Sequence, residues 1–380
     1  MLRTYLVTVM IIAGVTGPSE IARADVGSLD PSFGAGGIQV TDLDQLDYAY
    51  DVLVRTDGSI VVVGRSEASG PATRDAVMVR YDADGAPIGT SIFSRTQWGC
   101  GDVPEAFHSV VEEADGRLLA AGYAQYDCGG PQRDFWIVRT LADGTEVERF
   151  DRPSFYDEIE NGWEVAVRPD GWIVATGFAA PSASDPSTRD IAFTQYNPNG
   201  TVDTTGFGSG GETAVDVAGD YDFSYAMTLQ PDGKIVAAGF ATISGQRDLA
   251  LVRLDDDGTL DTSFGTGGVA TVDFNGHDDR ARDVLALEDG RLLVAASRTA
   301  VDGVTREFVV ARFSDDGTLD ISFGTGGVAA VDFGAGNAAA LALGLTPTGR
   351  IAVAGYVEPV PDDHSSRDFA VARLHPDGSL

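Results

Sequence analysis

The stretch that decides the fold, residues 268–326, reads GVATVDFNGHDDRARDVLALEDGRLLVAASRTAVDGVTREFVVARFSDDGTLDISFGTG. A turn with the glycine Gly290 joins two apolar runs, and a third apolar run opens at Arg306. A second turn, with the glycine Gly317, leads toward a fourth run. Short apolar runs separated by such turns predict four β-strands in this stretch.

The same unit recurs along the whole chain. The glycine of the first turn recurs at Gly58, Gly116, Gly171, Gly233, Gly290 and Gly349. The glycine of the second turn recurs at Gly85, Gly144, Gly200, Gly258, Gly317 and Gly378. Successive glycines in each series are 55 to 62 residues apart, which counts six units. This period with four strands per unit indicates propeller blades. We therefore predict an all-β fold, a six-bladed β-propeller of four-stranded antiparallel blades.

The two ends of the chain complement each other. The run after each first turn is apolar throughout, as in a strand covered on both faces, so we place it second from the axis and the preceding run innermost. The segment GGIQVTDL at 36–43 has the outermost pattern, whereas the strand at 369–374 is of the third type and lacks an outer partner. We predict that residues 36–43 close the ring by pairing with 369–374, which removes two exposed edges.

The repeated motifs resemble a known family. They are Asp-Gly, Arg-Asp-x4-Arg and DGTLDxSFGxGG, and the last appears as LDTSFGTGG at 260–268 and LDISFGTGG at 319–327. This set resembles the delta-60 repeat family of bacterial β-propellers. The linkers after Gly85 and Gly144 depart from the motif, and Gln195 replaces the usual arginine. The resemblance implies an extracellular or envelope propeller and supplies no catalytic residues.

The first residues have the pattern of a secretory signal. Arg3 precedes an apolar run at 6–15, and Ala22-Arg23-Ala24 matches a signal peptidase site. The run is shorter than the roughly 20 apolar residues that span a bilayer. We predict a signal peptide at 1–24 with cleavage after Ala24, and a single propeller domain at 25–380. The protein is expected to be secreted or periplasmic, a monomer, and not inserted in a membrane.

The charge of the chain is strongly acidic. It carries 58 acidic and 26 basic residues, for a net charge of −32. Nucleic acid and anionic membranes are poor partners for such a protein, and a well hydrated surface explains the charge better than a cation site. Lys234 is the one lysine, so the basic residues are nearly all arginine.

Arginines recur in nearly every blade, and we interpret them as structural for that reason. They comprise the Arg-Asp steps at Arg74, Arg133, Arg189, Arg247 and Arg367, and the strand arginines Arg80, Arg139, Arg253, Arg312 and Arg373. We expect the strand arginines to pair with carboxylates near the ends of outermost strands, worth about 0.2 to 1 kcal/mol each. Those carboxylates are Asp42, Asp216, Asp273 and Asp332.

No metal or cofactor is predicted. The acidic turns DADG, DDDG and SDDG lack the spacing of a calcium loop, and the four histidines fit no ligand spacing. The two cysteines do allow a prediction. Cys100 precedes the innermost strand of blade 2 and Cys128 lies between its second and third strands, so both fall on one face of the ring. In an exported protein this favours a disulfide between Cys100 and Cys128.

Six equivalent positions of the innermost strands would form a ring around the axis. They are Tyr50, His108, Trp163, Tyr225, Arg282 and Leu341. These side chains either fill the hole in the ring or line a concave site on the face that carries the variable loops. The acidic residues Asp47, Glu160 and Asp222 lie nearby in the sequence, and aromatic faces beside acceptors suit a sugar or a cationic group.

We therefore predict an exported, non-catalytic propeller that binds a saccharide, peptide or protein through its variable-loop face. One alternative is an enzyme of the six-bladed lactonase or sugar-dehydrogenase kind, with a cation such as Ca²⁺ in the axial channel. Another is a purely structural envelope protein. The fold alone does not separate them.

Overall fold

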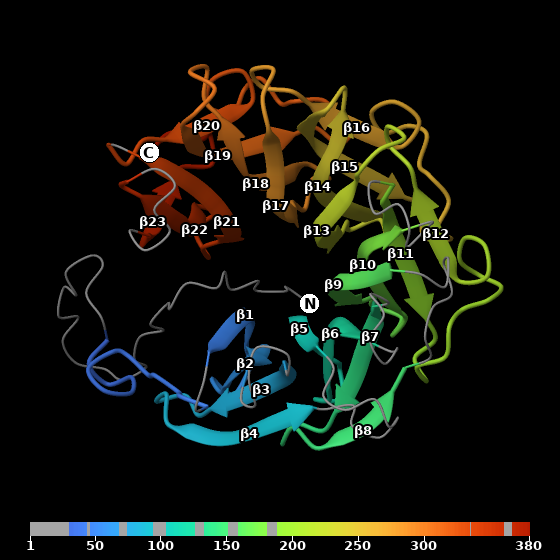
Figure 1. Ribbon diagram of the computed structural model, residues 1–380, viewed down its shortest axis with the longest axis vertical. Coiled ribbons are helices and arrows are strands. Elements are labelled where there is room, and N and C mark those ends of the chain that lie inside the picture. The colour runs from blue at the N-terminus through green and yellow to red at the C-terminus, as the bar shows by residue number, and fades with distance from the viewer. Residues whose placement is uncertain are drawn as a thin grey trace.

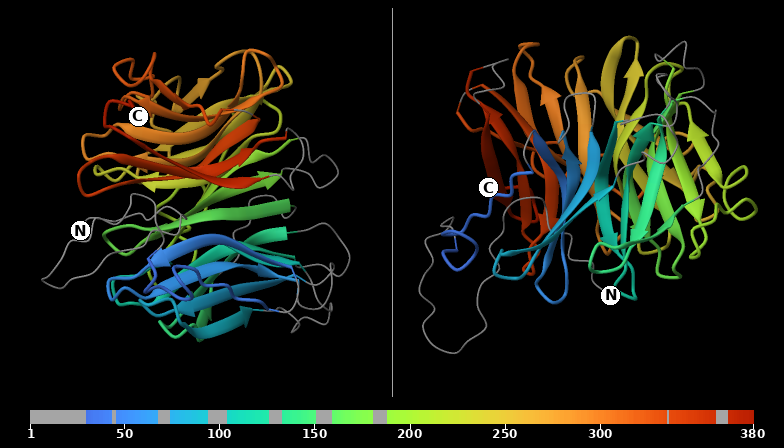
Figure 2. Two further views of the ribbon diagram at one scale, coloured as in Figure 1. Left: turned by 90° about the vertical axis from the view of Figure 1, so that its left-hand side faces the viewer. Right: turned by 60° about the horizontal axis from the view of Figure 1, so that its bottom comes forward.

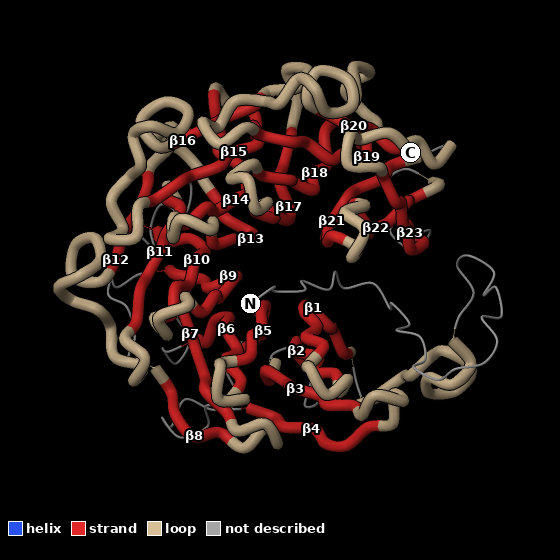
Figure 3. The backbone as a smooth tube through the Cα atoms, turned by 180° about the vertical axis from the view of Figure 1, so that it is seen from behind, coloured by secondary structure: helices blue, strands red, loops and turns tan. Residues whose placement is uncertain are grey.

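The computed structural model describes residues 30–43, 46–67, 74–93, 104–125, 133–150, 159–180, 188–334, 336–360 and 367–380. Six antiparallel sheets surround one axis, as predicted for a six-bladed β-propeller (Figure 1). Strands, turns and loops make up this part of the chain, without a helix (Figure 3). Within the same residues, no helix is long and apolar enough to cross a membrane.

Each blade uses its strands in chain order from the axis outward. Blade 1 has β1 (Asp47–Val54), β2 (Ile60–Ser66), β3 (Asp75–Tyr81) and β4 (Pro87–Phe93). Blade 2 has β5 (Glu105–Glu112), β6 (Leu118–Gln125), β7 (Arg133–Thr140) and β8 (Glu146–Arg149). Blade 3 has β9 (Ile159–Val167), β10 (Ile173–Ala180), β11 (Asp190–Tyr196) and β12 (Glu212–Val215).

The second half of the ring repeats this order. Blade 4 has β13 (Phe223–Leu229), β14 (Ile235–Ile243), β15 (Gln246–Leu254) and β16 (Val269–Val272). Blade 5 has β17 (Asp279–Ala286), β18 (Leu292–Thr299), β19 (Arg306–Phe313) and β20 (Val328–Val331). Blade 6 has only β21 (Asn337–Leu345), β22 (Ile351–Glu358) and β23 (Asp368–Leu374) in its sheet.

Strands run between two faces of the ring, as the side views in Figure 2 show. Because successive strands alternate in direction, the glycine turns, such as those at Gly290 and Gly317, lie on one face, here called the turn face. The connections into the inner strands, such as 275–278, and those between second and third strands, such as 300–305, lie on the other, here called the loop face.

The hydrophobic core lies between neighbouring blades. Leu251 of blade 4, for example, belongs to one buried cluster with Val294 and Val309 of blade 5. Similar clusters join blades 1 and 2, 2 and 3, 3 and 4, and 5 and 6. The continuous apolar runs of the second and third strands therefore supply both faces of each blade, as the sequence predicts.

The linker motif LDTSFG at 260–265 fastens blade 4 to blade 5. Asp261 accepts hydrogen bonds from the Ser263 hydroxyl at 2.6 Å and from Arg253 Nε at 2.7 Å. Phe264 is fully buried, and the Gly265 amide donates to the Asp316 carbonyl of blade 5 at 2.7 Å. The same pattern recurs one blade later, where the Gly324 amide donates to the Asp377 carbonyl.

The predicted partners of three strand arginines, Arg139, Arg253 and Arg312, are wrong. Arg253 pairs with Asp261 of the linker, whereas Asp273 accepts the backbone amides of Asn275 and Gly276 in its own loop. Asp216 and Asp332 likewise accept loop amides. The linker turn holds the Asp261 carboxylate beside Arg253, which is why the two residues pair. Asp273 follows the end of β16, which lies on the opposite face, so it cannot reach Arg253.

The predicted closing strand is not confirmed. Residues 36–43 form no strand, and β23 pairs on one side only, leaving Phe369 100% and Val371 54% exposed. The linker that precedes this segment is nevertheless docked on blade 1, because the Gly34 amide donates to the Asp84 carbonyl at 2.7 Å. Thr41 Oγ1 also lies 2.7 Å from the Tyr81 hydroxyl. The segment thus keeps its contact with blade 1 but does not extend β23.

Candidate functional site

The six predicted ring positions share one structural feature. Each is the extra residue of a β-bulge in an innermost strand. In blade 5, for example, Ala281 pairs with Ala296 and Asp283 with Ala295, so Arg282 has no partner in the ladder. The equivalent unpaired residues are Tyr50, His108, Trp163, Tyr225 and Leu341. A bulge re-aims one side chain, and such bulges are common beside functional sites.

A glycine opposite the bulge makes this geometry fit. A Cβ at Gly177 would lie 1.8 Å from the Asn161 carbonyl oxygen, and one at Gly239 would lie 1.7 Å from the Phe223 carbonyl oxygen. Five of the six second strands carry this glycine, as in SIVVVG and KIVAAG, and blade 5 has Ala296 instead. The glycine that ends these runs is therefore the sequence signal for the bulge, and sequence reasoning missed it.

Five of the six bulge residues contact one another around the axis. The rings of Tyr50 and His108 are 5.0 Å apart, and His108 stacks on Trp163 at 4.1 Å. Trp163 meets Tyr225 edge to face at 5.3 Å, and the Arg282 guanidinium lies 4.2 Å from the centre of the Tyr225 ring. The structure thus brings these predicted residues together in one chain of contacts.

His108 has a packing role within this chain. Its Nδ1 lies 2.9 Å from the Gly162 carbonyl oxygen. Burial lowers the pKa of His108 to about 4, so the imidazole is neutral at physiological pH. A neutral ring between two aromatic neighbours supports the position of Trp163 and adds no charge to the site.

The predicted acidic acceptors lie at the starts of inner strands and hold loops. Asp222 is fully buried, and its carboxylate accepts the amides of Val217 at 2.7 Å and Thr242 at 3.2 Å. Asp47 accepts the Leu43 amide at 2.8 Å, and Glu160 is 1% exposed. Burial raises the pKa of Asp222 to about 7. Glu160 and Asp222 are therefore placed beneath the surface, away from a ligand in the mouth of the ring.

A hollow of about 420 Å³ opens on the loop face beside Trp163. Its lining comes from blades 2, 3 and 4 and consists of Gln125, Arg133, Asn161, Trp163, Phe178, Arg189 and Phe223. We call it the aromatic hollow. The rings of Phe178 and Phe223 are 4.9 Å apart, and those of Trp163 and Phe223 are 5.3 Å apart. These contacts make one continuous apolar wall.

Two of the repeated arginines stand in this wall, although the sequence analysis interpreted them as structural. Arg189 Nη1 donates to the Tyr221 hydroxyl at 2.7 Å, and its guanidinium lies 4.4 Å from the centre of the Phe178 ring. Arg133 lies 4.8 Å from the centre of the Tyr123 ring. Both arginines line the hollow, while the aspartates that follow them are buried.

Parts of the predicted site lie outside the described residues. This applies to Cys100 and Cys128, whose disulfide stays a prediction, and to the loop segments 94–103 and 151–158. In the part of the chain that the structure describes, no three His, Cys, Asp or Glu side chains are grouped to hold a metal ion.

Comparison with known families assigns the repeats. Five segments match the profile of a family described as "Domain of unknown function (DUF5122) beta-propeller". They are residues 113–145, 168–205, 230–264, 287–323 and 346–380. Each runs from a first turn through the second and third strands to the second turn or its linker. Five of the six units are therefore similar to repeats of a β-propeller family, while the more specific resemblance to the delta-60 repeat stays a prediction.

Other comparisons add little about activity. No curated protein matches the chain. An ulvan lyase, a polysaccharide lyase, is 10% identical over 86% of this chain and 78% of its own, with a TM-score of 0.46. An endo-arabinase from Bacteroides thetaiotaomicron is 12% identical over 88% of this chain and 96% of its own, with a TM-score of 0.43. Likeness at this level carries no inference about substrate.

Proposed function

We propose that this protein is an exported β-propeller that binds a saccharide through its loop face. The aromatic hollow carries the proposal, because the partly exposed Trp163, supported by the buried rings of Phe178 and Phe223, lies next to the polar side chains Gln125 and Asn161. Sugar rings stack on aromatic faces while their hydroxyls take hydrogen bonds from such groups. Its volume of about 420 Å³ falls among ligand pockets, which span roughly 300 to 1,000 Å³.

A saccharide suits this hollow better than a peptide. Extended peptides are commonly read by adding a strand to an open sheet edge. The described lining consists of side chains on inner, second and third strands that are already paired with neighbours. Recognition in this hollow must therefore come from side chains. Rigid aromatic rings flanked by polar groups are the arrangement that binds a sugar.

The test is isothermal titration against a panel of neutral and acidic oligosaccharides. Trp163→Ala should weaken binding of any saccharide that binds by at least tenfold, because a central tryptophan commonly contributes about 2 kcal/mol or more. Trp172→Ala is the matched control, since Trp172 follows the turn glycine Gly171 on the turn face. Unchanged affinity in a folded Trp163→Ala protein contradicts the proposed site.

A further inference from the structure

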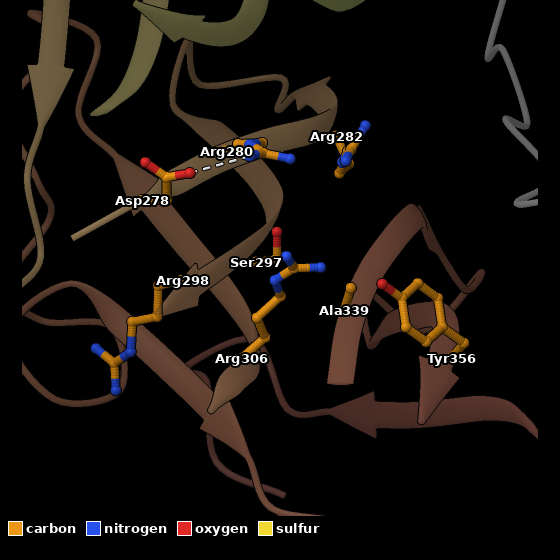
Figure 4. Close-up of a pocket in the computed structure, with 8 residues that line it drawn as sticks. All are labelled: Asp278, Arg280, Arg282, Ser297, Arg298, Arg306, Ala339 and Tyr356. Carbon is orange, nitrogen blue, oxygen red and sulfur yellow. Dashed lines mark hydrogen bonds and ion pairs between the residues drawn. The ribbon is translucent and has the colours of Figure 1, made fainter. Parts of the chain in front are cut away.

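Arginines of blade 5 gather at a second place on the loop face (Figure 4). The lining residues are Asp278, Arg280, Arg282, Ser297, Arg298, Arg306, Ala339 and Tyr356. We call this the arginine pocket. Figure 4 shows the Arg306 guanidinium beside Ser297, whereas Arg298 turns away. Arg298 is already paired with the Glu307 carboxylate at 2.5 Å.

The arginine pocket has an excess of positive charge. Arg280 is paired with Asp278 at 3.0 Å. Within the described residues, neither Arg282 nor Arg306 forms an ion pair. Arg282 is stacked on Tyr225, and Arg306 is exposed. Two guanidinium charges are thus left to a ligand, in a protein that carries 58 acidic residues against 26 basic ones.

Unsatisfied donors point in the same direction. The buried Nε atoms of Arg189, Arg280 and Arg282 have no hydrogen-bond acceptor among the described residues. A buried polar atom without a partner is costly, and few native structures keep one without a reason. Arg80 near the turn face has an Nε of the same kind, so the case for an anionic ligand rests mainly on the unpaired charges of Arg282 and Arg306.

The arginine pocket and the aromatic hollow are connected. Trp163 lines the hollow and contacts Tyr225, and Arg282 of the arginine pocket stacks on the same Tyr225. The pocket itself holds only about 20 Å³, which is space for one oxygen-sized group rather than a sugar ring. A ligand lying across both places would set a ring against Trp163 and direct an acidic substituent toward Arg282 and Arg306.

The overall charge helps to choose between polyanions. A net charge of −32 repels a densely charged chain, and duplex DNA carries one charge per about 1.7 Å of axis. A saccharide with one acidic group per sugar is much less dense and can pair locally with arginines. Guanidinium groups suit this task because they bind carboxylate or sulfate oxygens in pairs and also stack on rings.

We propose that the saccharide is acidic and bears carboxylate or sulfate groups; this inference rests on the proposed function. It lies with a sugar on Trp163 in the aromatic hollow and an anionic group between Arg282 and Arg306, and Arg133 and Arg189 take a second anionic group at the far side.

The experiment measures binding of three hexasaccharides by titration calorimetry. They are a galacturonic acid hexamer, its carboxyl-reduced galactose counterpart, and a sulfated galactose hexamer, which separates sulfate from carboxylate recognition. At least one acidic hexamer should bind ten times or more tighter than the neutral one. That advantage should shrink when ionic strength rises from about 0.05 M to about 0.3 M, since salt screens exposed charges. Tighter binding of a uridine hexanucleotide than of either acidic hexamer overturns the proposal.

Variants separate this proposal from the proposed function. Arg282→Met with Arg306→Met should weaken the acidic hexamer by about 10- to 100-fold and the neutral one by less than about twofold. Arg306→Met alone should weaken the acidic hexamer by a smaller factor. Because Arg306 is exposed, this substitution does not threaten folding. Arg291→Met, on the turn face, is the matched control and should change neither affinity.

The two proposals can fail independently. Equal binding of acidic and neutral hexamers, both lost in Trp163→Ala, overturns acidic recognition and leaves saccharide binding in place. Binding of no saccharide, by the original protein or by any variant, overturns both.

Discussion

Arg253 on the turn face and Arg189 on the loop face are bonded in different ways. On the turn face Arg253 is 2% exposed, and its guanidinium contacts the Asp261 carboxylate at 2.7 Å and the Asp315 carbonyl at 2.6 Å. On the loop face Arg189 stacks on Phe178 and keeps one buried donor unpaired. The first arrangement is complete within the protein, whereas the second leaves one donor without an acceptor among the described residues.

Two carboxyl groups, one on each face, also differ, because their pKa values are shifted in opposite directions. Hydrogen bonds from Ser322, Arg291 and Arg312 hold the pKa of Asp320, on the turn face, well below its usual value. Burial raises the pKa of Asp279, on the loop face, to about 7. Recurrence in every blade therefore does not by itself make a residue structural. The loop-face arginines themselves differ, because Arg298 pairs with Glu307, whereas Arg189 stacks on Phe178.

The largest expected effect breaks the turn-face network. Arg253→Ala removes one partner of a buried ion pair and should lower the free energy of unfolding by about 3 to 5 kcal/mol. Arg189→Ala should lower it by about 1 kcal/mol or less, because no carboxylate depends on that guanidinium. Urea unfolding of both variants measures the difference. Equal losses would mean that the two faces do not differ as described.

The next largest loss of stability is expected from substituting Phe264, the linker residue buried between blades. Phe264 is 0% exposed between blades, so Phe264→Ala should cost about 3 kcal/mol or more. Phe33 occupies the same motif position but is only half-buried, and Phe33→Ala should cost clearly less. Melting temperature and urea midpoint measure both. A larger loss at Phe33 would show that the N-terminal linker carries more of the ring than the interior linkers do.

Closure of the ring gives a smaller effect. In blade 5, Val310 pairs with Ala329, and the same register would place Gln39 opposite Val371 in blade 6. Gln39→Cys with Val371→Cys should form a disulfide if residues 36–43 complete blade 6, and should add about 2 to 4 kcal/mol. Mass spectrometry of a proteolytic digest detects the link, and each single variant is a control. Absence of the link in folded, oxidised protein would mean that β23 remains an open edge.

The faces also predict a dependence of stability on pH, which is spread over several groups. Burial raises the pKa of three inner-strand carboxyls, Asp222, Asp279 and Asp283, to about 7. Above pH about 4 the unfolded state has released these protons while the folded state still holds them, so stability decreases as pH rises toward 7. His108 acts oppositely, losing stability as pH falls from about 6.5 to about 4, but it is one group against three.

We therefore expect a higher free energy of unfolding at pH about 5 than at pH about 7.5, measured by urea unfolding across this range. Asp279→Asn keeps a neutral side chain at every pH and should flatten the profile. Asp316→Asn is the control, because hydrogen bonds from Thr318 lower the pKa of that turn-face carboxyl and it is charged throughout this range. Stability that increases from pH about 5 to 7.5 would contradict the assignment.

The sequence predicts the fold and the axial ring well, for a physical reason. Glycines at positive φ, such as Gly290, are required by their turns and mark every blade. Spacing from those turns also located Trp163 and Tyr225, because each bulge residue lies 8 positions before its turn glycine. The recurrence of the Arg-Asp step did not predict the role of Arg189. Its contacts, such as Tyr221, are brought to it by the fold and not by the repeat. Ring closure was predicted from the pattern of residues 36–43, but that pattern does not show whether the segment reaches β23.

In each innermost strand, the residues that pair in the sheet are distinct from the bulge residue, which lies beside the axis. The residue at a bulge has no partner in the ladder, so its identity is free of the register that holds the blade together. Tyrosine, histidine, tryptophan, arginine and leucine all occupy this one position around the axis. A propeller of this type can therefore acquire a new specificity by single substitutions at six sites. The same six positions are the natural ones to randomise in a library aimed at new ligands.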